Sequence, residues 1–100
     1  MSKTFKVTGP NGAFDAEQLA TFAHYIQNTQ FRFVVTRLPG STIADVTHRA
    51  SGKKVCSIPH ISLQATVGDY VVAGKSELKK LIERAGEARV RSVLSAAENQ

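Results

Sequence analysis

The stretch that decides the fold is residues 31–58, FRFVVTRLPGSTIADVTHRASGKKVCSI. Its first part, residues 31–38, is rich in aromatic and β-branched side chains, which are typical of strands. Pro and Gly at 39–40 follow in the order of a type II turn, and residues 42–49 then predict a returning strand. A second glycine-containing turn leads to a third strand over residues 54–58. Because consecutive strands usually pair, this stretch predicts a three-stranded antiparallel meander.

The segment before the meander predicts a short strand, a turn and a helix. Residues 3–8 alternate apolar and polar side chains, which indicates a strand, and the cluster GPNG at 9–12 indicates a turn. Asp15 has the character of a helix N-cap, with Gln18 at the capping-box position. We therefore predict a helix over about 16–27. Its apolar stripe has the spacing i, i+3, i+4, i+7 and consists of Leu19, Phe22, Ala23 and Ile26. We expect this stripe to pack on Phe31, Phe33 and Val35.

The C-terminal third predicts a helix that changes direction. Ser76 is the expected N-cap, and Gly86 has the character of a helix C-cap. The helix before Gly86 has an apolar stripe of Leu78, Leu81, Ile82 and Ala85. The next stripe is rotated by roughly 120° and consists of Val90, Val93, Leu94 and Ala97. We therefore predict either a break near Gly86 or a second apolar face that meets a partner. Residues 59–73 fit a pair of strands, a loop or a poorly formed helix.

These elements predict a single α+β domain over residues 1–100. Its antiparallel sheet would follow the order β-α-β-β-β-(β)-α, with two helices covering one face. The chain has 42% apolar and 21% charged residues, which is ordinary for a folded domain of this length. It has no apolar run long enough for a membrane span. The single cysteine, Cys56, allows no internal disulfide and favours a reducing, cytoplasmic location.

The charge distribution favours an anionic partner. The formal net charge is +5, and the pI is about 9.7. Most of the excess lies in residues 31–60, where five Arg and Lys face one Asp. Such a balance favours nucleic acid, either DNA or RNA, or an acidic protein surface. The candidate phosphate-binding residues are Arg37, Arg49, Lys53, Lys54, Lys75, Lys79 and Lys80.

The predicted order of helix, three strands and helix resembles that of the double-stranded-RNA-binding domain. Residues 74–80, GKSELKK, stand where that family places basic residues at the start of its last helix. The resemblance implies phosphate contacts from Lys75, Lys79 and Lys80. Residues 59–73 have no counterpart in the family.

The sequence predicts no catalytic site, metal, cofactor or small-molecule substrate. Gly74-Lys75-Ser76 ends like a P-loop, but Asp69 stands where the first glycine is needed. We interpret it as a loop glycine followed by a helix cap. Cys56 could be combined with His48 or His60 and with Asp45 into a nucleophilic site. Its position between Val55 and Ser57 in a strand indicates a core residue instead.

The leading functional hypothesis is therefore a non-enzymatic nucleic-acid-binding or nucleoprotein-binding module. The alternative is a protein-binding accessory or inhibitor protein of the kind found in phages and plasmids. It would act through a strand edge or through the C-terminal stripe of Val90, Val93, Leu94 and Ala97. If the C-terminal helix is continuous, the second stripe predicts a homodimer.

Overall fold

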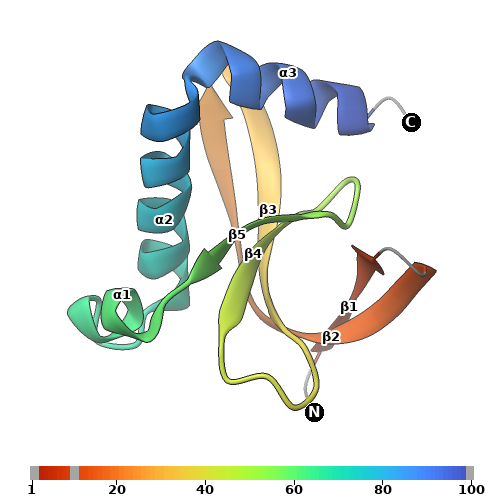
Figure 1. Cartoon of the computed structure of the whole chain (residues 1–100), viewed down its shortest axis with the longest axis vertical. Helices are drawn as coiled ribbons and strands as arrows, with labels where there is room; N and C mark the ends of the chain where they lie inside the picture. Colours follow the sequence, from red (N-terminus) through yellow and green to blue (C-terminus); the bar gives the residue numbers. More distant parts are fainter. Residues whose placement is uncertain (1–2, 10–11, 99–100) are drawn as a thin grey trace.

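The computed structural model describes residues 3–9 and 12–98 and places five strands before three helices (Figure 1). The strands are β1 (Lys3–Gly9), β2 (Gly12–Ile26), β3 (Thr29–Arg37), β4 (Ala44–His48) and β5 (Lys54–Ile58). The helices are α1 (His60–Ala65), α2 (Tyr70–Ala85) and α3 (Glu87–Glu98). The turn predicted at 9–12 lies partly outside the described residues. Among the described helices, none is long and apolar enough to cross a membrane.

The strands form one antiparallel sheet in the order β1-β2-β3-β4-β5, and α2 and α3 pack on one of its faces (Figure 1). The predicted α+β class, with helices covering one face of an antiparallel sheet, is confirmed. The meander is also confirmed, as β3, β4 and β5. The predicted order of elements is wrong, because a strand occupies the place of the first helix.

That strand is β2, which replaces the helix predicted over about 16–27. It pairs with β3 along Glu17–Ile26, so backbone hydrogen bonds that a helix would make internally are made across the sheet instead. Phe22 and Ile26 have the same spacing in a strand face and in a helix stripe, because four residues fit both periods. Asp15 caps no helix; its carboxylate lies 2.8 Å from Lys6 Nζ on β1.

The β2–β3 turn shows why the strand continues. Gln27 and Asn28 both have positive φ, 49° and 65°, as a two-residue type I′ hairpin requires. Asn tolerates that conformation better than most residues. The dipeptide Gln27-Asn28 was therefore the sequence signal for a hairpin at this point.

A bulge at Leu19 curls the sheet. The pairing register advances from Gln18 to Ala20 on β2 while β3 advances by one residue, which leaves Leu19 unpaired. Bulges bend a strand and increase its twist. Here the bend divides β2 into a half that pairs with β1 and a half that pairs with β3. The curl brings Thr8 on β1 to the β4–β5 turn, where its N–H donates to the Gly52 carbonyl at 2.8 Å.

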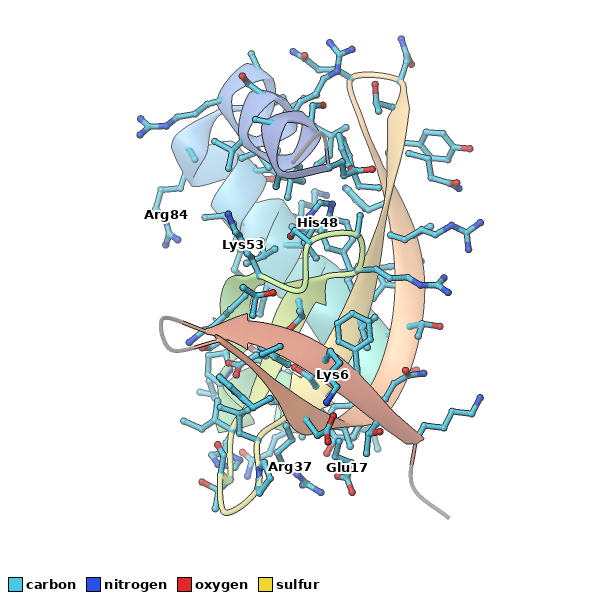
Figure 2. The ribbon with its side chains drawn as sticks, turned by 90° about the vertical axis from the view of Figure 1, so that its right-hand side faces the viewer. Lys6, Glu17, Arg37, His48, Lys53 and Arg84 are labelled. Atoms are coloured by element: carbon cyan, nitrogen blue, oxygen red, sulfur yellow. The ribbon has the colours of Figure 1, made fainter. Side chains whose placement is uncertain are left out.

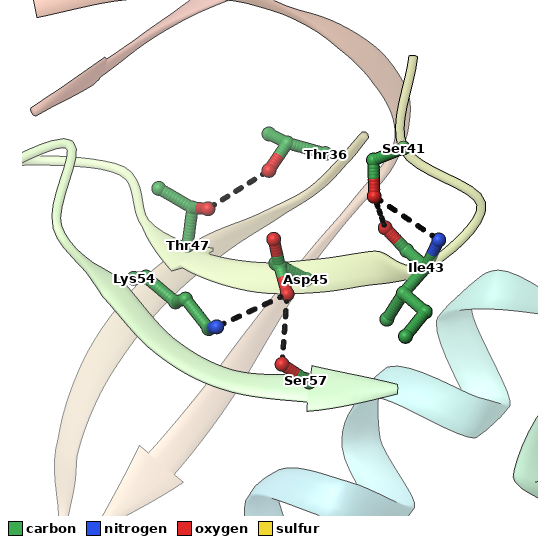
Figure 3. Close-up of polar contacts among 7 residues, drawn as sticks. All are labelled: Thr36, Ser41, Ile43, Asp45, Thr47, Lys54 and Ser57. Atoms are coloured by element: carbon green, nitrogen blue, oxygen red, sulfur yellow. Dashed lines mark hydrogen bonds and ion pairs between the residues drawn. The ribbon is translucent and has the colours of Figure 1, made fainter. Parts of the chain in front are cut away.

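The curl encloses a small core on the sheet face opposite the helices. Thr36 and Thr47 are buried there, and their hydroxyls lie 3.0 Å apart, so each satisfies the other (Figure 3). A buried hydroxyl without a partner would be costly. The buried apolar side chains on this side are Val7, Ala16 and Val34.

The main core lies between the sheet and the helices. The rings of Phe22 and Phe33 stack with centroids 5.4 Å apart. Phe31 and Val35 are buried beside them, as is Ile26. The predicted packing of these two sets is confirmed, but it joins neighbouring strands rather than a helix and a strand. The predicted contributor Leu19 is only partly buried, at the bulge.

Residues 59–73 form helical structure rather than a strand pair. The short helix α1 begins after Pro59, and α2 begins at Tyr70. The Asp69 carboxylate caps α2 by accepting the N–H groups of Val71 and Val72 at 3.0 and 3.1 Å. The predicted cap at Ser76 is therefore wrong, because Ser76 and the supposed loop glycine Gly74 lie inside α2.

Gly86 ends α2 and redirects the chain. Its φ is +95°, and its N–H donates to the Ile82 carbonyl at 2.8 Å. The next helix, α3, runs across the end of α2 (Figure 1). This change of direction lets Val90 and Leu94 reach the same core as Leu78 and Ile82. The predicted break is confirmed, and the continuous helix for which a homodimer was expected does not form.

We expect Phe22→Ala to lower the free energy of unfolding by about 3–5 kcal/mol, because it removes the ring between β3 and α2. Phe14→Ala is the matched control on the same strand, since that ring is 41% exposed whereas Phe22 is 8% exposed. Urea unfolding followed by circular dichroism measures both. Equal losses for the two variants would contradict this core.

Candidate binding groove

The β4–β5 turn and the two long helices form a groove with a volume of about 240 Å³. We call it the hairpin–helix groove. Its apolar lining comes from the hairpin, from the last turns of α2 and from α3: Val55, Leu81, Ala85, Val90, Val93, Leu94 and Ala97. Val93 is 61% exposed, whereas Val90 and Leu94 are buried below it. The groove therefore offers accessible apolar surface on a firmly packed base.

Three cations stand at the border of this groove: Lys53, Lys54 and Arg89. Among the described residues, no carboxylate lies within ion-pair distance of Lys53 or Arg89. Lys54 Nζ lies 3.6 Å from Asp45 Oδ1, which also accepts the Ser57 hydroxyl at 2.9 Å (Figure 3). No described residue that lines the groove is acidic. The border therefore carries positive charge that little compensates.

His48 fixes α3 over the groove. Its buried imidazole places Nδ1 2.8 Å from Ser51 Oγ and Nε2 3.1 Å from Glu98 Oε2. Ser51 Oγ also accepts the Lys53 backbone N–H at 3.3 Å, as in a side-chain-stabilised turn. Figure 2 shows His48 and Lys53 below α3, with Arg84 extending outward from α2. The contacts of His48 join the β4–β5 turn to the last turn of α3.

The structure brings together part of each predicted site. Lys53 and Lys54, predicted for phosphate binding, border the same groove that the predicted partner-binding stripe lines. The stripe residues are not equivalent, because Val90 and Leu94 are used in the core. Val93 and Ala97 are left to meet a ligand.

The other predicted phosphate-binding residues lie elsewhere. Arg37 forms an ion pair with Glu17 at 2.6 Å, and Lys80 forms one with Glu77 at 3.3 Å. Arg49 lies in a hollow on the sheet face opposite the helices. The seven cations therefore do not form one surface.

Lys75 and Lys79 lie beside β2, near His24. Burial lowers the pKa of His24, and the charges of the two lysines lower that pKa further. Both lysines lie inside α2, away from its start, and a strand stands where an N-terminal helix was expected. The order of elements therefore does not follow the resemblance to the double-stranded-RNA-binding domain.

Cys56 does not have the properties of a nucleophile. Burial, followed by the charges of Glu77 and Asp45, raises the pKa of its thiol to about 11. It packs against the main core. Among the described hydrogen bonds, none joins Cys56 to a histidine, because His48 is bonded to Ser51 and Glu98. The described residues also contain no cluster of three side chains that could hold a metal.

Sequence reasoning missed Arg89 at this site. The helix break was predicted, and it is the break that turns Arg89 toward the groove beside Val90. The residue lies between the two apolar stripes, and without the position of the β4–β5 turn nothing related it to Lys53. Its charge was therefore counted only toward the overall balance.

Comparisons with protein-family models, with curated proteins and with solved structures find no match for this chain.

We expect Cys56 to react slowly with iodoacetamide in the folded protein at pH 8, because its thiol stays protonated until the pH approaches 11. The rate should rise steeply between pH 9 and pH 11, where the thiolate forms. In urea the same cysteine should react at pH 8 like an ordinary thiol. Rapid alkylation of the folded chain at pH 7 would contradict this assignment.

Proposed function

We propose that this domain is a non-enzymatic binding module that holds an acidic, amphipathic segment of a partner protein in the hairpin–helix groove. The observation that carries the proposal is the combination of an apolar lining with a cationic border in one groove. An accessory or inhibitor protein that covers an acidic protein surface would act in this way.

The apolar part of the groove supplies the anchor. Val93 exposes most of its side chain, and Leu81 and Ala97 are partly exposed beside it. An amphipathic helix that lays its apolar face in a groove anchors through residues at positions i, i+3 or i+4, and i+7. Burying an aliphatic side chain contributes about 1.5–3 kcal/mol. Such anchors would make Val93 the residue on which affinity depends most.

The cationic border supplies the choice of partner. Lys53 and Arg89 flank the apolar surface and have no carboxylate of their own within ion-pair distance. Acidic residues at the edges of a docked segment would meet them. Charges at the rim of an interface mainly raise the association rate and exclude partners of like charge. A basic segment with the same apolar face would be repelled.

This groove fits a protein segment better than a nucleic acid. Its apolar lining is aliphatic, whereas bases bind on aromatic rings or guanidinium planes. Phosphate contacts require cations but gain nothing from Val93 or Leu81. The leading hypothesis of nucleic-acid binding therefore draws no support from this site.

The test uses two designed helical peptides with the same leucine stripe, one with glutamates and one with lysines on its flanks. We expect only the acidic peptide to bind in isothermal titration. Its binding should shift backbone amide resonances of Leu81, Ala85, Val93 and Ala97 in the labelled full chain. Val93→Glu should weaken it by about tenfold or more, since about 1.4 kcal/mol corresponds to a factor of ten.

Ile61→Glu is the matched control, because it introduces the same charge at an apolar residue on α1 that is 75% exposed. It should leave the affinity for the acidic peptide within about twofold. Equal binding of the acidic and basic peptides, or equal losses in the two variants, would reject the groove as the site.

A further inference from the structure

The sheet face that the helices leave uncovered carries a second surface. Beyond the part enclosed by the curl of β1 and β2, paired residues of β2 and β3 share this face: Ala23 with Arg32, and Tyr25 with Gln30. Tyr25 is 66% exposed, and Gln30 and Arg32 are exposed. Together with Thr21 and Arg49, these residues form what we call the open face.

Two arginines lie side by side on the open face. The Arg49 backbone N–H donates to the Arg32 carbonyl at 3.0 Å, which places the two residues next to each other. Both line a hollow of about 130 Å³ with Thr21 and Ala23. Among the described residues, no carboxylate lies within ion-pair distance of either guanidinium. Glu98 comes close to the pair but accepts from His48.

The exposed ring of Tyr25 completes the surface. It lies opposite Gln30, two residues along β3 from Arg32, which is about 7 Å at the rise of a strand. The small side chain of Ala23 leaves the space between ring and guanidinium open. An exposed aromatic ring beside unpaired guanidinium groups offers one partner for a base and another for a phosphate.

We propose that the open face binds single-stranded nucleic acid. A base would stack on Tyr25, and the neighbouring phosphates would meet Arg32 and Arg49. In a duplex the bases are stacked on each other and cannot reach the ring, so the surface favours a single strand. A protein partner would need apolar anchors, and apart from Tyr25 the exposed side chains here are polar or charged. The face lies away from the hairpin–helix groove, so this inference does not depend on the proposed function.

The test is fluorescence anisotropy of the full chain with a labelled oligothymidylate, at several salt concentrations. We expect binding at low salt that is tighter than to the matched duplex. The double variant Arg32→Ala, Arg49→Ala should weaken binding and reduce the slope of log affinity against log salt by about 1.4, which corresponds to two phosphate contacts on a single strand. Lys75→Ala with Lys79→Ala removes the same charge on the helix side and should leave that slope nearly unchanged.

Tyr25 is tested separately from charge. Tyr25→Ala should weaken binding by about fivefold or more without changing the salt slope, because it removes stacking rather than a phosphate contact. Tyr25→Phe keeps the ring and should bind like the natural chain. Absence of binding at low salt, tighter binding to the duplex, or equal losses in the two charge variants would overturn the proposal.

Discussion

The contact of Phe22 with Phe33 beneath Gly74 determines the positions of the other elements. A Cβ atom at Gly74 would lie 2.9 Å from the Phe22 ring, closer than side chains pack. The backbone of α2 therefore sits directly on the aromatic pair. This close approach sets the height of α2 above β2 and β3. It also determines where Gly86 releases the chain and where α3 crosses the sheet.

Both proposed sites follow from that arrangement. Because α3 turns at Gly86, Val93 and Arg89 face the β4–β5 turn, and a groove forms where two apolar stripes would otherwise have pointed in different directions. Because β2 bends at Leu19, the β1–β2 hairpin covers only part of the other sheet face. The remainder of that face keeps Arg32 and Tyr25 accessible. The two surfaces have different chemistry, aliphatic in one case and aromatic with guanidinium in the other, so they suit different partners.

The sequence was informative where one period or one special residue decided the structure. The meander was predictable from its β-branched strands and its turns, and Gly86 was predictable as a break. The region of β2 was misread because Phe22 and Ile26 satisfy both the helix and the strand period. The pairing with β3, which is a tertiary contact, decides between them. Tyr25 was missed for the same reason, since in a helix it would not share a face with Arg32.

The most direct test of this account is the backbone conformation of residues 16–26 in the full chain, measured by NMR. The account predicts strand-type Cα chemical shifts throughout, interrupted only at Leu19, and cross-strand nuclear Overhauser effects that link Phe22 with Phe33. Helical shifts over the same residues, with strong effects between successive amide protons, would contradict it. In that case the aromatic pair, the seat of α2 and the open face would all be misplaced.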